Sequence, residues 1–431
     1  MVAAWRWLPA WHLAATGRHA MRADTGVAGA PHGEPGAAPT RGERPLWQIA
    51  LAAWLAQRLL LAALVLLWQA LLGLLSPTAF FRVWTLYDAR FYTSIARAGY
   101  HLISQAAFFP LYPLLMRLSA PLVGGDVTLA GLLLANLCAL GALLLLAQLV
   151  AREFGRRAAQ RALLYYAIFP TGFYLAAEYT EGLFLLLSVA TFLCLRQRRW
   201  LLSGALIALA TLTRAPGALL LLPLLIEAWR ALRPRWAALG GARRRQVAWA
   251  LAGAVALPPL ALLAFQVYLA QAYGRPDIMS LAANQPLWAR YLDWPWTGAV
   301  IDINSLTGAN GYPQAFGLRF AIVKDLLFFV FWLGLSVIML LPARFSFTPR
   351  LPASWVAYSW AALLQVSLLP NHNPGFGLMS YPRFALVMFP CIVLMALISL
   401  RSPRAQLVLF ALCVAWTIIL VRLMAAGEFV G

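Results

Sequence analysis

Charged side chains are scarce in this sequence. They make up 11% of the 431 residues, whereas 62% of the residues are hydrophobic. Much of the apolar sequence lies in runs close to the ~20 residues that cross a hydrocarbon core as a helix. The pattern is typical of an all-α polytopic membrane protein, so we expect the lipid bilayer itself to be a partner of this chain.

Acidic residues are scarcer than basic ones, which leaves a formal net charge of +20. In a soluble protein this balance would suggest nucleic acid. Here the arginines fall mostly in short segments between the apolar runs, where they encode membrane topology, so we expect no nucleic-acid partner. With the N-terminus cytoplasmic, the positive-inside rule assigns to the cytoplasmic side the loop with Arg344 and Arg350 and the loops 152–161, 196–199, 230–245 and 401–404.

Cysteines number only four, and all lie inside apolar runs without a CxxC spacing. We expect small buried side chains there, in place of a disulfide framework or a zinc site. The sequence also lacks GxxxxGKS/T, HExxH and GxSxG motifs and a GxGxxG on a strand. Nothing therefore supports a soluble nucleotide-binding protein, a zinc protease or a hydrolase. The carboxylates are too scattered for a metal-ligand pattern, so no metal ligand is assigned, no cofactor is firmly implied, and a need for a divalent metal stays open.

Apolar runs dominate what is present. Residues 1–45, rich in Arg, Gly, Ala and Pro, predict a disordered cytoplasmic tail, and residues 46–431 predict a single multispanning membrane domain. We expect about 11 transmembrane helices, within a range of about 9 to 13. Two long outer loops, 76–126 and 271–324, carry many aromatic residues and are expected to bear short amphipathic helices.

The segment "WTLYDARFYTSIARAGY" opens the first outer loop with an unusually polar pattern. Its spacing predicts a short helix from Asp88 to Ala98 that stops at Gly99 and lies at the outer interface. Asp88 is either the N-cap of that helix or a catalytic carboxylate, and both roles stay open. Further on, Pro110 and Pro113 in "AFFPLYPLLMRL" predict a bent segment in place of a regular helix.

Charged residues also stand at the ends of later apolar runs on the outer side. Glu178 and Glu181 in "AAEYTEGLF" are one helical turn apart, so one helix face would carry both. They are either a solvated pair at a helix end or functional groups, because charge near the membrane is costly unless it faces water or a partner. Arg214 is either an interfacial anchor or the partner of an anion, which would be one of the glutamates or a substrate phosphate.

A further polar segment, "PNHNPGFGLMSYPRF", lies at another outer boundary and contains His372, Tyr381 and Arg383. His372 is either a solvated loop histidine or a ligand or acid–base group. The candidate substrate-binding residues are therefore Glu178, Glu181, Arg214, His372, Tyr381 and Arg383. Separate places in the sequence thus deliver polar side chains to one side of the membrane.

Five segments resemble the PIG-V-type mannosyltransferases, the family that includes the second mannosyltransferase of GPI-anchor assembly. They are "YDARFYTSIARAGY", "AFFPLYPLLMRL", "IFPTGFYLAAEYTEGLFLLLS", "LATLTRAPGALLLLPLL" and "SYPRFALVMFP". They occur in the order and spacing of that family over most of the chain. The sequence departs from the family pattern at Tyr87, where the family usually has a tryptophan before the acid.

The resemblance implies the multispanning architecture of C-type glycosyltransferases, with an acid in the first outer loop and a polyprenyl- or dolichyl-phosphate sugar as donor. By position, Asp88 is similar to that acid, Glu181 to the acid of the "YTE" element, Arg214 to the arginine of "TRxxG", and Arg383 to the arginine of the closing element. The arginine-rich, lysine-poor usage resembles a bacterial member, which implies a bacterial cell membrane with the active site on its outer face.

These observations lead to the hypothesis of an inverting mannosyltransferase that uses a polyprenyl-phosphate sugar and an unidentified glycan, lipid or protein acceptor. Asp88 would be the catalytic base, Arg214 and Arg383 would hold the phosphate, and Glu181 would orient the acceptor or an arginine. A transporter or flippase would also place charges in a membrane cavity, although no inverted repeat is apparent and the charges gather on one face. A non-catalytic membrane subunit is the third possibility.

Overall fold

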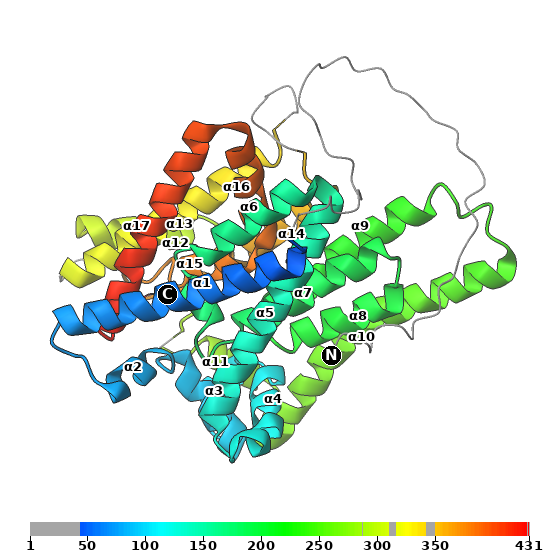
Figure 1. Cartoon of the computed structure of the whole chain (residues 1–431). Helices are drawn as coiled ribbons and strands as arrows, with labels where there is room; N and C mark the ends of the chain where they lie inside the picture. The colour runs from blue at the N-terminus through cyan, green and yellow to red at the C-terminus, as the bar shows by residue number, and fades with distance from the viewer. Residues whose placement is uncertain (1–43, 287, 310–315, 342–349, 429, 431) are drawn as a thin grey trace. The chain divides into compact units, whose positions relative to one another are not determined.

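The computed structural model describes residues 44–286, 288–309, 316–341, 350–428 and 430 (Figure 1). Across these residues the chain forms helices α1 to α17 and four short 3₁₀ helices, and the strand-like pairing is limited to one bridge between Arg290 and Asn371. The predicted tail lies outside the described residues except for Arg44 and Pro45. Of the two arginines in the predicted cytoplasmic loop with Arg344 and Arg350, only Arg350 is described. The expected all-α class is confirmed.

In the described part of the chain, six helical segments are long and apolar enough to span a membrane: α1 (Leu46–Leu71), α5 (Val127–Phe154), the η4–α9 segment (Ala215–Leu232), α10 (Gly241–Tyr273), α13 (Phe316–Ile338, from Gly317) and α17 (Pro403–Ala425). A seventh span is added if α15 (Tyr381–Val387) and α16 (Phe389–Arg401), which meet at a 78° bend, act as one. The chain is thus an integral, polytopic membrane protein.

The structure offers fewer full-length spans than the eleven expected from the apolar runs. Three of those runs form the short helices α7 (Glu181–Arg196), α8 (Trp200–Thr211) and α14 (Ala353–Ser367), and the run at 162–177 forms only the second half of α6 (Arg156–Ala167) and the 3₁₀ helix η3 (Gly172–Leu175). At 1.5 Å per residue, helices of 12 to 16 residues reach only about 18 to 24 Å, less than the ~30 Å hydrocarbon core. The apolar character of α7 reflects burial among other helices, whereas α8 exposes Leu201 and Leu202, and composition cannot distinguish burial from exposure to lipid.

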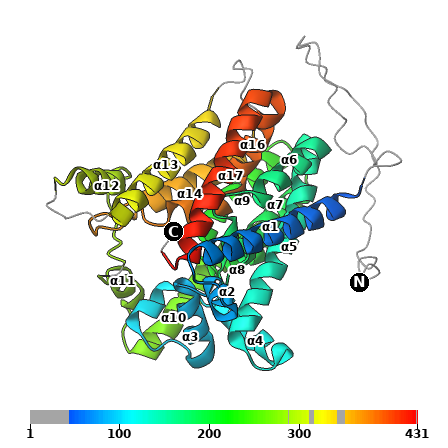
Figure 2. The same cartoon turned by 60° about the vertical axis from the view of Figure 1, so that its left-hand side comes forward.

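Helix α7 lies at the centre of the bundle and runs from Glu181 to Arg196. It packs against α5, α8, α9 and α15, and its side chains are buried along most of its length. The contact with α5 requires Gly182, because a Cβ there would stand 2.6 Å from the carbonyl oxygen of Ala135. On the other side of α5, α1 crosses the bundle and also contacts α17 (Figure 2).

The segment predicted as the first outer loop, 76–126, contains α2 (Pro77–Val83), α3 (Asp88–Ala98), η1 (Ile103–Ala107), α4 (Leu111–Ser119) and η2 (Ala120–Val123). The helix predicted from Asp88 to Ala98 is confirmed, and it ends at Gly99, whose φ is +76°. The prediction of a bent segment at the two prolines was wrong. Pro110 precedes α4 and Pro113 lies in its first turn, where the missing amide hydrogen removes no intrahelical hydrogen bond.

The second outer loop contains α11 (Ile278–Ala283) and α12 (Thr297–Thr307). It is shorter than expected, because α10 continues to Tyr273 and α13 already begins at Phe316. The four cysteines are unpaired, and Cys138, Cys391 and Cys413 are buried. These three are the small buried side chains that the sequence predicted, whereas Cys194 is partly exposed.

Candidate active site

Asp88 is the first residue of α3, and the turn that precedes it is held by a distant segment. The hydroxyl of Tyr179 donates to the carbonyl of Leu86 at 2.8 Å, and the amide of Glu178 donates to the carbonyl of Trp84 at 2.9 Å. Tyr87 then turns the chain into the helix with a φ of +57°, a conformation that is uncommon for a residue with a Cβ. The start of α3 is therefore fixed by contacts with the segment that leads into α7.

The carboxylate of Asp88 does not cap its own helix. The N-cap position belongs to Tyr87, which makes no side-chain capping bond, and Asp88 Oδ2 instead accepts a hydrogen bond from Arg383 Nη1. The side chain of Asp88 is 17% exposed, so it forms the accessible edge of an otherwise buried ion pair. The N-cap alternative raised by the sequence is contradicted by this geometry.

Arg383 and Arg214 share a second carboxylate, that of Glu181. Arg383 donates through Nε to Glu181 Oε1, and Arg214 donates through Nη1 to the same oxygen and to Thr180 Oγ1, the latter at 3.2 Å. Glu181 is fully buried at the start of α7, and both arginine side chains are less than 10% exposed. Asp88, Arg383, Glu181 and Arg214 thus form a continuous chain of ion pairs, here called the Asp88–Arg214 chain.

The Asp88–Arg214 chain is assembled from four segments that are far apart in the sequence. Asp88 comes from α3, Glu181 from α7, Arg214 from the junction of α8 and η4 (Ala215–Leu220), and Arg383 from α15. The structure thereby brings together the four residues that the resemblance singled out. Because a buried charge is tolerated only when it is paired, this arrangement explains why these charged residues interrupt apolar sequence.

Aromatic rings surround the two arginines. The guanidinium carbon of Arg383 lies 4.6 Å from the ring centroid of Tyr179 and 5.2 Å from that of Tyr174. The corresponding carbon of Arg214 lies 5.4 Å from the ring of Phe384. Such contacts favour a cation that has lost water, so the rings help to keep both guanidiniums charged inside the protein. One oxygen of the Asp88–Arg214 chain, Glu181 Oε2, is buried and accepts no hydrogen bond from the described residues.

Glu178 is not part of the Asp88–Arg214 chain, contrary to the expected shared helix face. Helix α7 begins at Glu181, so Glu178 lies in the segment before it and points elsewhere. Its Oε1 accepts from Thr93 Oγ1, and its aliphatic carbons lie close to Gly131 of α5. Full burial raises the pKa of Glu178 to about 8, against which the Thr93 hydrogen bond is a smaller effect. The reading as a solvated pair is also wrong.

His372 and Tyr381 have their own partners. His372 Nε2 is 3.1 Å from Asp293 Oδ2, and its ring stacks on Tyr291 with centroids 3.5 Å apart. The hydrogen bond from His372 lowers the pKa of Asp293. Tyr381 is buried and its hydroxyl pairs with that of Ser367. These contacts shape the loop before α15, and the structure gives neither residue a bond to the Asp88–Arg214 chain.

Arg290 was not singled out from the sequence, although it faces the same region. Its guanidinium donates to the carbonyl oxygens of Leu369 at 2.8 Å and Met379 at 3.0 Å, and no described carboxylate pairs with it. It lies 6.0 Å from the ring of Phe384, the ring that Arg214 also approaches. Burial lowers the pKa of Arg290 to about 10, and Tyr381 and Asp88 act in the opposite direction. A lone arginine in a long loop carries no sequence signal of this placement.

Asp302 is a second residue that the sequence did not single out. Its two carboxylate oxygens accept hydrogen bonds from the amides of Gly377 at 2.7 Å and Leu378 at 3.0 Å, which ties α12 to the segment before α15. The side chain is 1% exposed, and burial raises its pKa to about 7 despite the two amides. Asp302 therefore positions the backbone that leads to Arg383. Among the described residues, no group of three or more His, Cys, Asp or Glu side chains is placed to hold a metal ion.

Comparison with known proteins adds to this geometry. The sequence model of the dolichyl-phosphate-mannose-protein mannosyltransferases matches residues 104–263, a segment that includes Glu181 and Arg214. No curated protein matches the chain. The crystal structure of the Archaeoglobus fulgidus oligosaccharyltransferase in complex with Zn and sulfate is similar with a TM-score of 0.38 and 13% identity, over 80% of this chain and 48% of that one. This chain thus spans about half the length of that protein. The family match over residues 104–263 supports a membrane glycosyltransferase.

Proposed function

We propose that this protein is an integral-membrane glycosyltransferase that transfers mannose from a polyprenyl-phosphate carrier to an acceptor hydroxyl with inversion. The observation that carries the proposal is the Asp88–Arg214 chain, in which a partly exposed carboxylate is held by a buried arginine network. Its setting supports the reaction class, because Glu181 and Arg214 fall inside the segment similar to mannosyltransferases that use a lipid-phosphate sugar.

Asp88 acts as the general base in this proposal. Its bond to Arg383 uses Oδ2, which leaves Oδ1 to accept the proton of the incoming hydroxyl. The guanidinium of Arg383 fixes the position of the carboxylate, as a base that receives a proton in the transition state requires. The acceptor oxygen bonds to the anomeric carbon as the bond from that carbon to the phosphate oxygen breaks. The proton passes to Asp88, and the electron pair of the broken bond leaves on the phosphate.

Arg290 is the best candidate to hold the phosphate of the donor. The sequence had pointed to Arg214 and Arg383, but both guanidiniums already face Glu181, and Arg383 also holds Asp88. Among the described residues, Arg290 donates to carbonyl oxygens and pairs with no carboxylate, so its charge remains to be neutralised by an anion. A planar guanidinium suits a phosphate, and charge developing on a leaving group is stabilised by a cation fixed in advance.

The proposal places the reaction on the outer face of a bacterial cell membrane, with the N-terminus in the cytoplasm. Glu181 and Arg196 lie at opposite ends of α7, so the Asp88–Arg214 chain and the arginine loop that follows α7 are separated along the bundle. Arg156, in another arginine-rich loop, donates to the carbonyl of Arg44 just before α1. This contact supports an N-terminus on the side of the arginine loops, which the positive-inside rule assigns to the cytoplasm.

The test uses the purified full chain in lipid nanodiscs with radiolabelled polyprenyl-phosphate mannose and a membrane extract as acceptor source. We expect label transfer with release of polyprenyl phosphate, and a loss of at least ~10²-fold in the Asp88→Asn variant. Asp277→Asn, which changes an exposed acid of the other outer loop, is the matched control and should keep full activity. Near-normal turnover of Asp88→Asn would refute the base assignment. Movement of intact donor across liposomes without cleavage would favour the transporter.

A further inference from the structure

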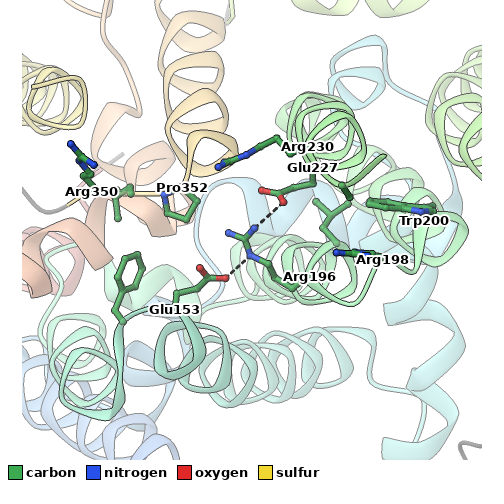
Figure 3. A pocket seen from close by; sticks show the side chains of 12 residues that line it. Glu153, Arg196, Arg198, Trp200, Glu227, Arg230, Arg350 and Pro352 are labelled. Atoms are coloured by element: carbon green, nitrogen blue, oxygen red, sulfur yellow. Dashed lines mark ion pairs between the residues drawn. The ribbon is translucent and has the colours of Figure 1, made fainter. Parts of the chain in front are cut away.

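A cavity of about 580 Å³ opens at the far end of α7 from the Asp88–Arg214 chain (Figure 3). It lies between the ends of α5 and α7, the start of α8, the second half of α9 (Leu221–Leu232) and residues Arg350–Pro352. Glu181 begins α7 and Arg196 ends it, so about 22 Å of helix separates the two regions. The cavity is therefore distinct from the candidate active site.

Both carboxylates of the cavity share one arginine, Arg196. Arg196 forms ion pairs through Nε with Glu153 and through Nη1 with Glu227, the latter at 2.8 Å, as the dashed lines in Figure 3 mark. The hydroxyl of Ser354 donates to the other oxygen of Glu227. The three charged side chains are only 12 to 25% exposed. Because one arginine is shared by two carboxylates, this group keeps one uncompensated negative charge, and the other arginines of the cavity outnumber it.

Three more arginines line the same cavity: Arg198, Arg230 and Arg350. All three are exposed, and none pairs with an acid among the described residues. Arg198 has a φ of +56°, a conformation that costs a residue with a Cβ roughly 1–2 kcal/mol. The cavity thus carries two more positive than negative side chains. The positive-inside rule asks only that a cytoplasmic loop be basic, whereas these charges line one concave space.

The chemistry of the walls indicates the class of ligand. Guanidinium groups bind phosphate oxygens through planar, paired donors, and a phosphomonoester carries about −1.5 to −2 charges at neutral pH, which matches the excess. Phe154, Leu195 and Leu351 add apolar surface beside the charges. Trp229, next to Arg230 on α9, is 65% exposed, and exposed tryptophans mark the level of lipid headgroups. We propose that this cavity binds a phosphate dianion, supplied either by a lipid headgroup that is a phosphomonoester or by free phosphate.

The test measures binding by native mass spectrometry of the full chain released from detergent. The probes are dioctanoyl phosphatidic acid, dioctanoyl phosphatidylglycerol and inorganic phosphate. Phosphatidic acid should bind more tightly than phosphatidylglycerol, which carries a phosphodiester with a single charge. The double variant Arg230→Gln/Arg350→Gln should weaken binding by at least roughly tenfold, because each change removes charge-assisted hydrogen bonds. Both side chains are exposed, so folding should be unaffected.

Arg245→Gln is the matched control, because Arg245 is an exposed arginine of α10 that does not line the cavity. Its variant should bind phosphatidic acid as the unchanged protein does. Stronger binding of phosphatidic acid than of inorganic phosphate would identify a lipid headgroup as the source, and equal binding would identify free phosphate. An equal loss in Arg245→Gln, equal binding of both lipids or no binding of any probe would overturn the proposal.

Discussion

Replacing Glu181 by glutamine tests the Asp88–Arg214 chain most directly. Glu181 is fully buried, and its Oε1 accepts from both Arg214 and Arg383. Gln keeps the shape of the side chain but removes the charge, so Arg383 would retain only Asp88 as a carboxylate partner and Arg214 would retain none among the described residues. Removing one partner of a buried ion pair typically lowers the free energy of unfolding by about 3–5 kcal/mol. We expect Glu181→Gln to fall in that range.

The assay is equilibrium unfolding of the purified protein in mixed micelles with increasing SDS. Asp277→Asn supplies the control, because the Arg275–Asp277 pair is more than half exposed and such pairs contribute about 0–1 kcal/mol. The double variant Glu181→Gln/Arg214→Gln should lose less stability than the two single variants added together, since it also removes an uncompensated charge. A loss for Glu181→Gln no larger than that of the control would refute the reasoning.

Three further predictions follow from the same geometry. Arg290→Gln should raise the KM for the polyprenyl-phosphate sugar by roughly tenfold or more, because a charge-assisted bond to the phosphate is lost; an unchanged KM in steady-state assays would contradict this role. Burial raises the pKa of Glu178 from 4.5 to about 8, so between these values the folded state binds a proton that the unfolded state lacks, and the free energy of unfolding should fall as the pH rises. SDS unfolding should therefore show a lower stability at pH 8 than at pH 5, and this loss should be smaller in Glu178→Gln. Asp302→Asn leaves one of two backbone amides without an acceptor and should cost about 1–3 kcal/mol of unfolding free energy in the same assay; an unchanged midpoint would show that the tie is dispensable.

Local sequence accounts for the elements whose residues interact with near neighbours. The helix from Asp88 to Ala98 and its stop at Gly99 follow from short-range spacing and from the freedom of glycine at positive φ. The apolar runs predicted the membrane class for the same reason, since hydropathy is a property of each segment. The number of full-length spans was overestimated, because α7 and α14 are apolar through burial in the bundle and are too short to cross a bilayer alone.

The sequence by itself determined that this protein is an α-helical membrane protein with charges at the ends of its apolar runs, and the resemblance pointed to Asp88, Glu181, Arg214 and Arg383. Only the tertiary structure decided how these charges pair. Arg383 joins Asp88 and Glu181 across 295 and 202 residues of sequence, whereas Glu178, three residues from Glu181, turns toward Thr93. Pairing of buried charges depends on distances set by helix packing, and no local pattern encodes such distances.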